Sequence, residues 1–257
     1  MTRMEDKIED MISQRMYSRL SELFFPLAKI LGEDAKYYVC GNSCNAAIPN
    51  DYDIYPVDKS FNFDVIKCHT KVKGHDIKVI CETKNALTMN INGVVVQFCS
   101  YHKNSLEELV ESFDYAHIQV GIKVVSEWHL DDDTLFYTYD TSHIEQVYTS
   151  SAYIESHVLG TTWFTGSEYP LSSLIRHTKY NSRGNFATKA ESTANILSIL
   201  TAIIQRGFRS YEDFKDQLAA IDLLLLSEEE HNAASELYSV ACSRGLVDYP
   251  NVDMEEI

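Results

Sequence analysis

Two acidic residues separated by a single position, Asp51 and Asp53, constrain this chain more than any other feature. Side chains at positions i and i+2 of a strand lie on the same face of a sheet. Two carboxylates held this close repel each other unless a cation lies between them. Mg²⁺ accepts one or two carboxylates and completes its octahedral shell with water and substrate phosphates. The pair therefore predicts a strand over residues 51–57 that carries a Mg²⁺ site, with Mn²⁺ as the alternative metal.

The residues that precede the acidic pair form an apolar run ending in small and polar residues. Residues 36–40 predict a buried strand, and Gly41, Asn42 and Ser43 follow it directly. Glycine permits a tight turn whose backbone N–H groups can approach a phosphate closely. The turn and the acidic pair together predict a site for a metal-bound polyphosphate. Taken singly, Gly41 has a plainer reading as an ordinary turn residue, and the acidic pair as a solvated entry into a strand.

Hydrophobic periodicity divides the chain into a mixed first part and a helical second part. The sequence Asn92-Gly93 between two apolar runs is typical of a β-hairpin. Residues 134–158 leave a further hairpin and short helices both open. The pattern favours an α+β fold with two domains, residues 1–165 and 166–257. The predicted helices are 5–31, one starting at Ser105, 171–184, 190–206, 211–226 and 228–244, and the predicted strands are 36–40, 51–57, 76–82, 87–91, 94–98 and 113–125.

Two local signals refine these boundaries. Ser105 followed three residues later by Glu108 predicts a capping box at the start of a helix. Pro26 predicts an end or a kink in the first helix, because proline lacks the N–H that the helix interior uses. The acidic run Ser227 to Glu230 is typical of a helix start, and the acidic tail 248–257 is expected to be loose.

Composition excludes several classes of function. The formal net charge of -16 argues against non-specific coating of DNA or RNA, which needs an excess of lysine and arginine. Six cysteines without a CxxC pair predict buried thiols in a reducing, cytoplasmic environment. No apolar run approaches the roughly 18 residues of a membrane span, and the charged N-terminus is unlike a secretion signal. A local basic path for RNA would depend on a few residues, among them Arg206, Arg209 and Lys215.

Four segments, in order and in rough spacing, resemble the polymerase-β-type nucleotidyltransferase superfamily. They are Gly41-Asn42-Ser43, Asp51-Tyr52-Asp53-Ile54, the segment Phe113 to Gln119, and the segment Pro170 to Gly184. The last two are similar to motifs in the head domain of class II tRNA nucleotidyltransferases, which include CCA-adding enzymes and bacterial poly(A) polymerases. The resemblance extends over about residues 36–186. It also extends to uncharacterised nucleotidyltransferase-like proteins of phages and bacteria.

The resemblance implies a small mixed or antiparallel nucleotidyltransferase sheet with flanking helices, followed by a helical C-terminal domain. It implies that Asp51 and Asp53 are catalytic and hold the metal, and that Asp114 contacts the ribose. It also implies that cations of the later helix hold the triphosphate. The full set of nucleotide-binding residues is then Gly41, Asn42, Ser43, Asp114, Arg176, Lys179, Tyr180 and Arg183.

Several of these residues have alternative readings. Arg176, Lys179 and Arg183 share one face of a helix, and such a face is often simply solvated. Asp114 could cap a turn. Tyr180 could stack on a base or fill the core.

Three departures from the family pattern affect the expected chemistry. Gln97 stands where many members carry a third carboxylate, and a neutral amide is a poor general base. Ser172 and Ser173 stand at two positions where the family has arginine, and Tyr169 replaces the acid that opens that helix.

These observations predict an enzyme that moves a nucleoside monophosphate from an NTP to a hydroxyl acceptor and releases pyrophosphate. An RNA 3′ end such as that of tRNA is the leading acceptor, and a small molecule or a protein hydroxyl stays open. The alternative is a member of the same fold that binds or senses NTP with weak chemistry, or that modifies proteins by AMPylation. A purely structural role is the third class. The sequence does not specify the oligomeric state.

Overall fold

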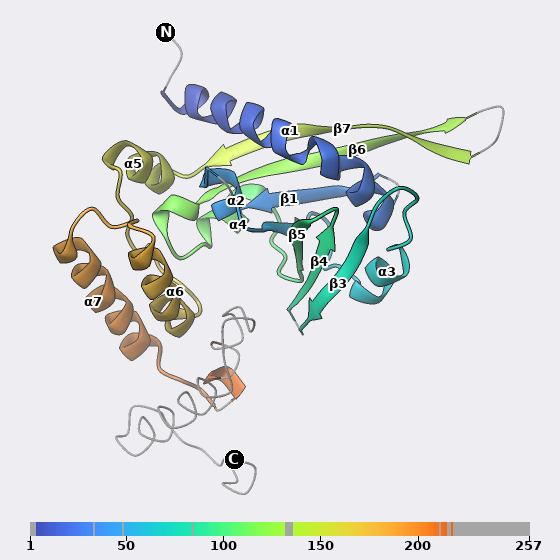
Figure 1. Ribbon diagram of the computed structural model, residues 1–257. Coiled ribbons are helices and arrows are strands. Elements are labelled where there is room, and N and C mark those ends of the chain that lie inside the picture. Colours follow the sequence, from blue (N-terminus) through green and yellow to red (C-terminus); the bar gives the residue numbers. More distant parts are fainter. Residues whose placement is uncertain are drawn as a thin grey trace, which may run out of the picture. The chain divides into compact units, whose positions relative to one another are not determined.

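The computed structural model describes residues 4–32, 34–47, 49–83, 85–131, 136–210, 212–214 and 217, with side chains except at 129–138 and 140. The chain divides into two compact units, Met1–Leu159 and Gly160–Ile257. Figure 1 shows the sheet in the first unit and paired helices in the second. None of the described helices is both long and apolar enough to cross a bilayer.

The described part of the first unit is built on a seven-stranded sheet with the order β3-β4-β5-β2-β1-β6-β7. The β2–β5 pair is parallel, and the other neighbouring pairs are antiparallel. The predicted mixed sheet is therefore confirmed. The strands are β1 (Lys36–Cys40), β2 (Tyr52–Pro56), β3 (Ile77–Glu82), β4 (Ala86–Ile91), β5 (Val94–Cys99), β6 (Val120–Asp131) and β7 (Phe136–Thr149).

One face of the sheet packs against the long helix α1 (Met4–Leu31), which confirms the first predicted helix. Its fully buried side chains recur at three- and four-residue steps and join the strands in one apolar core. The helix continues through Pro26, so of the two outcomes predicted for this proline, an end or a kink, the end does not occur. Leu27 and Ile30, which lie beyond the proline, are buried, and burying each such side chain contributes about 1.5–3 kcal/mol.

The other face of the sheet is covered by the short helix α4 (Leu106–Glu111). Leu106, Leu109 and Val110 pack on strand residues of β1. The Ser105 hydroxyl accepts the N–H of Glu108 as predicted (3.2 Å). The Glu108 carboxylate, however, accepts the backbone N–H of Asn104 rather than that of Ser105 (3.4 Å). Only half of the expected capping box is therefore formed.

The hairpin prediction is confirmed, and one strand prediction is partly wrong. Asn92 and Gly93 have φ values of 55° and 88°, as a tight two-residue turn requires. The strand expected over 113–125 begins only at Val120, after the 3₁₀ turn η1 (Ala116–Ile118). The Gln119 side-chain amide donates to the Phe113 carbonyl (2.8 Å), and this contact holds the chain in a loop.

Two further elements complete the first unit. Helix α3 (Phe63–Cys68) was not predicted, although Asn62 caps it by accepting the N–H groups of Asp64 and Val65. Residues 134–158, which the sequence left open, contain strand β7 and helix α5 (Ser151–Leu159).

The second unit contains helices α6 (Pro170–Ser182) and α7 (Lys189–Arg206), and both were predicted. A capping box between Thr188 and Glu191 starts α7. Apart from residues 212–214 and 217, the helices expected over 211–226 and 228–244 and the acidic tail lie outside the described residues.

Candidate nucleotide-binding site

Strand β2 carries Asp53 in the middle of the sheet, between β5 and β1. Tyr52 and Ile54 are buried in the core that faces α1, whereas Asp51 and Asp53 are half-buried. Asp51 lies immediately before the strand. The alternation of burial through residues 51–56 places both acids on the side of the sheet opposite α1, as the spacing predicted.

The glycine turn follows β1 at the same end of the sheet. Cys40, the last residue of β1, is the cross-strand partner of Asp53, so Gly41 begins the turn next to the acid. Gly41 has φ 77° and ψ −140°, a conformation that disfavours any side chain. Its N–H donates to the Val120 carbonyl (2.8 Å), which ties the turn to β6. Sheet pairing therefore brings together the two motifs that the sequence separates.

Asn42 and Ser43 continue from the turn into the short helix α2 (Asn42–Asn45). Asn42 is half-buried, whereas Ser43 is only 2% exposed. The Ser43 hydroxyl donates to the Cys40 carbonyl (3.0 Å). This hydroxyl therefore helps to shape the turn.

Two arginines that the sequence analysis did not single out fix the far side of this turn. Arg15 and Arg19 extend from α1 and donate to backbone carbonyls of residues 43–47. The Tyr153 hydroxyl, from α5, donates to the Asn45 side-chain oxygen (3.2 Å). The sequence signal for the two arginines is the spacing of Arg15 and Arg19, four residues apart on one helix face.

Asp114 lies in the loop between α4 and η1 and is 3% exposed. The neighbouring Phe113 ring contacts the Tyr55 ring of β2, with centroids 5.9 Å apart. The adjoining turn η1 packs against α2 and α5. The structure thus brings the Phe113–Ile118 segment to the region of β2 and the glycine turn, although these motifs are far apart in sequence.

Gln97, the neutral replacement for a carboxylate, lies directly beside Asp53. The two residues are partners in the parallel β2–β5 pair. The Gln97 amide nitrogen donates to the Thr88 hydroxyl (3.2 Å), and its oxygen accepts from the Cys99 thiol (3.9 Å). These contacts orient the amide, so that Gln97 offers an uncharged oxygen next to the acidic pair.

Three polar side chains near Asp53 are uncharged at neutral pH. Burial raises the pKa values of Cys40, Cys99 and Tyr55 well above their usual values, and the charge of Asp53 adds to the effect in each case. These thiol and phenol groups therefore stay protonated. They leave the negative charge on this face of β2 to the carboxylates.

Asp51 and Asp53 form a partial donor set for a metal ion. Among the described residues, no group of three or more histidine, cysteine, aspartate or glutamate side chains is arranged to hold a metal ion. Asp51 and Asp53 therefore provide two carboxylates without a third. Mg²⁺ commonly binds through one or two carboxylates plus substrate phosphates, so the pair fits a metal that arrives with a polyphosphate rather than a dedicated protein cage.

The remaining predicted residues lie on α6, in the second unit. Arg176 and Lys179 are half-buried and Arg183, at the end of the helix, is exposed. Tyr180 is 5% exposed, which favours the alternative in which it fills the core. The contact of these residues with nucleotide stays a prediction.

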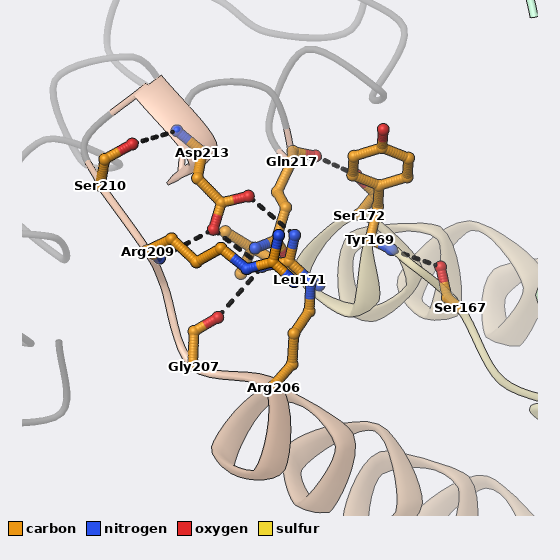
Figure 2. Close-up of polar contacts among 10 residues, drawn as sticks. All are labelled: Ser167, Tyr169, Leu171, Ser172, Arg206, Gly207, Arg209, Ser210, Asp213 and Gln217. Carbon is orange, nitrogen blue, oxygen red and sulfur yellow. Dashed lines mark hydrogen bonds and ion pairs between the residues drawn. The ribbon is translucent and has the colours of Figure 1, made fainter. Parts of the chain in front are cut away.

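The two serines at the family's arginine positions belong to the interior of the second unit. Ser172 and Ser173 are fully buried. The Ser172 hydroxyl donates to the backbone carbonyl of Gln217 (Figure 2). The side-chain oxygen of Gln217 accepts the backbone N–H of Leu171 (3.2 Å). Arginine side chains would not fit such buried positions without rearrangement, so the substitution is matched by its surroundings.

Arg206, one of the few cations that a local basic path for RNA would use, is paired with an acid. Its guanidinium forms two parallel bonds with the Asp213 carboxylate (2.8 and 2.7 Å), as Figure 2 shows. The same carboxylate accepts the backbone N–H of Arg209 (2.9 Å). The charge of Arg206 is therefore neutralised within the unit. Lys215 lies outside the described residues.

Comparison with solved structures finds similar proteins at low sequence identity. The chain is similar to a CCA-adding enzyme in complex with ATP (12% identity, TM-score 0.48, covering 78% of this chain and 46% of that one). It is also similar to the Thermotoga maritima CCA-adding enzyme complexed with tRNA (12%, 0.48, 84% and 50%) and to a tRNA-processing enzyme in an apo form (10%, 0.43, 99% and 62%). The chain thus spans less than two thirds of each of these proteins.

No protein-family model matches the sequence, and neither does any curated protein.

Proposed function

We propose that this protein is a Mg²⁺-dependent nucleotidyltransferase that moves a nucleoside monophosphate from an NTP to a hydroxyl acceptor and releases pyrophosphate. One observation carries the proposal. The pairing of Cys40 with Asp53 brings the Gly41 turn and the acidic pair to the same end of the sheet. A turn suited to phosphate beside a pair of carboxylates is the arrangement that a metal-bound triphosphate requires.

Each group has a distinct role in this proposal. Asp51 and Asp53 hold Mg²⁺, which supplies charge stabilisation to the transferring phosphoryl group and to the leaving pyrophosphate. Gly41, whose own N–H is bound to the Val120 carbonyl, shapes the turn, and the backbone N–H groups of Asn42 and Ser43 bind the phosphates. Asp114 contacts the ribose. Arg176, Lys179 and Arg183 neutralise negative charge that develops during transfer, with Tyr180 beside them.

The proposed acceptor is the 3′ hydroxyl of an RNA such as tRNA, as the family resemblance implies. The acidic balance of the chain restricts how RNA can bind, because a net charge of -16 opposes a polyanion over most of the surface. Contacts with RNA should therefore be few and confined to local groups of cations.

Gln97 supports a second candidate function. Its amide is held by Thr88 and lies beside Asp53, where it cannot take a proton from an acceptor hydroxyl. A protein with this site could bind or sense an NTP while transferring it slowly. AMPylation of a protein hydroxyl would use the same site with a different acceptor.

The proposal is tested by incubating the protein with each α-labelled NTP, Mg²⁺ or Mn²⁺, and either total RNA or cell lysate. Label entering RNA supports the leading proposal, and label entering protein identifies AMPylation. The variant Asp53→Asn should abolish the transfer. Asp10→Asn, which removes an equal charge from the exposed surface of α1, should leave it unchanged.

Isothermal titration with NTP and Mg²⁺ separates the two candidate functions. Binding without pyrophosphate release under every acceptor would favour the sensing function. Absence of any NTP binding would contradict both.

A further inference from the structure

Two arginine side chains of α1 bind residues 43–47, the segment that continues from the glycine turn. Arg15 and Arg19 lie one helical turn apart, and both are half-buried. All their described hydrogen-bond acceptors are backbone carbonyls. Arg19 donates to the carbonyls of Ala46 (2.9 Å), Ser43 (3.4 Å) and Ala47, and Arg15 donates to the carbonyl of Asn45 (3.3 Å).

Within the described residues, neither Arg15 nor Arg19 forms an ion pair with an acid. A carbonyl accepts a hydrogen bond but carries no net charge, so the positive charge of each guanidinium persists. Two neighbouring cations without a described acidic partner create a local positive potential that favours an anion near the turn.

The turn and the segment that follows it are also held by α5 and β6. Tyr153, which is 1% exposed, donates its hydroxyl to the Asn45 side chain (3.2 Å). The Gly41 N–H is bound to the Val120 carbonyl (2.8 Å). Residues 41–47 are thereby attached to α1, α5 and β6 at once. A loop held by three separate elements keeps one geometry in the absence of ligand.

We propose that Arg15 and Arg19 are positioning residues for the triphosphate, an inference that rests on the proposed function. They fix the carbonyl side of residues 43–47 so that the Gly41–Ser43 turn is preorganised beside Asp53. Their uncompensated charge also lowers the energy of a polyanion at the turn. Both effects act on the phosphates and not on the base, so the arginines should govern triphosphate affinity for every NTP alike.

The experiment measures binding of inorganic tripolyphosphate in the presence of Mg²⁺ by isothermal titration. This probe contains the phosphates without base or ribose. Arg19→Gln removes both the charge and the forked donor, and we expect about tenfold weaker binding, the factor that corresponds to roughly 1.4 kcal/mol. Arg19→Lys keeps the charge but loses the fork, and should give an intermediate loss.

The matched control is Lys29→Gln. Lys29 lies on the same helix, and its ammonium group is 4.2 Å from the centroid of the Trp128 ring. The substitution removes the same charge at a distance from the turn, so tripolyphosphate affinity should be unchanged. With a nucleotide substrate, Arg19→Gln should raise the KM for NTP more than it lowers kcat, which a loss of folded protein would not do.

The outcomes separate this inference from the proposed function. If the unaltered protein binds neither tripolyphosphate nor NTP, the proposed function itself is wrong. If it binds and Arg19→Gln binds equally well, the proposed function stands and the inference is overturned. Equal weakening by Lys29→Gln would also overturn it, because bulk charge would then explain the effect. If Arg19→Gln does not fold, Arg15→Gln, which removes a single bond, should still weaken binding without lowering the melting temperature.

Discussion

The arginines of the two units are held by opposite kinds of partner. In the first unit, Arg15 and Arg19 donate to backbone carbonyls around the candidate site. In the second unit, Arg206 is bound by the Asp213 carboxylate through two parallel bonds. The side-chain type is the same and the number of satisfied donors is similar, but the net charge that remains is different.

This difference teaches that a count of cations is a poor guide to where a polyanion binds. A carboxylate partner cancels the charge and leaves a structural cross-link, whereas a carbonyl partner leaves the charge in place. From the sequence, Arg206 is one of the few cations that a local RNA path would use, and Arg15 and Arg19 are not among them. The structure adds the partners of each cation, and these partners decide what each charge can do.

The largest expected effect comes from a change to the acidic pair of the candidate site. Asp53→Asn keeps the size of the side chain but removes one of two charges that should hold the metal. Because metal stabilisation is worth several kcal/mol, label transfer should fall on the order of a hundredfold or more. Transfer at the original rate in Asp53→Asn would show that this carboxylate is not needed for the reaction. The proposal that the arginines of α1 position a triphosphate beside it would then lose its basis.

Gly41→Ala should be the next largest change. At φ 77° the added side chain strains the backbone, although no atom lies within 4 Å of the new Cβ. We expect a loss of about 1–3 kcal/mol in the free energy of unfolding. Gly32→Ala is the matched control, because Gly32 has φ 97° and equally open surroundings.

Both glycine variants should be destabilised in urea unfolding, but only Gly41→Ala should also weaken binding of Mg²⁺-tripolyphosphate. Equal binding by the two variants would show that the turn does not contact phosphate, and the carbonyl-held arginines would then be structural as well.

Arg206→Ala should affect stability and not ligand binding. It removes a paired charge from a pair that is mostly buried, with side-chain exposures of 22% and 17%. The expected loss is about 1–3 kcal/mol in the free energy of unfolding. It is measured by the fluorescence of Trp163 after Trp128, the other tryptophan of the chain, has been changed to phenylalanine. Weaker tripolyphosphate binding by this variant would contradict the difference between the carboxylate-bound Arg206 and the carbonyl-bound arginines of α1.

The smallest effect is a difference in pH dependence. The bond to Arg206, opposed by partial burial, lowers the pKa of Asp213 below its usual value of 3.8. Because the folded pKa is lowered, the stabilisation is present above pH 3.8 and is lost as the pH falls through the folded value. Asp213→Asn should remove this part of the acid sensitivity.

Backbone carbonyls do not titrate, so the contacts of Arg15 and Arg19 add no such slope. Urea unfolding of the unaltered protein, Asp213→Asn and Arg19→Gln between pH 6 and pH 3 tests this difference. The prediction is wrong if the loss of unfolding free energy with falling pH is unchanged in Asp213→Asn but reduced in Arg19→Gln. The acid sensitivity would then come from the contacts of Arg19.

Much of the architecture was predictable because local patterns and tertiary packing agree. The apolar stripe of α1, the Asn92-Gly93 turn and the Thr188–Glu191 start of α7 each specify their element within a few residues. The i, i+2 spacing of Asp51 and Asp53 likewise predicted their shared face. In these places the side-chain period alone decides the structure.

Other features depend on contacts between distant residues and have no local signal. The loop at 113–119 stays out of the sheet because Gln119 binds the Phe113 carbonyl. The register that sets Gln97 beside Asp53 follows from parallel pairing of strands separated by a hairpin. The contact of Arg19 with Ala46 joins residues that are 27 positions apart. Sequence patterns of short range carry no information on such pairs.

The most direct test is a crystal grown with Mn²⁺ and a non-hydrolysable NTP analogue, measured at a wavelength where manganese scatters anomalously. We predict an anomalous peak bound by carboxylate oxygens of Asp51 and Asp53, with the triphosphate against the Gly41–Ser43 turn. A nucleotide bound elsewhere, or a metal that avoids both acids, would contradict the assignment.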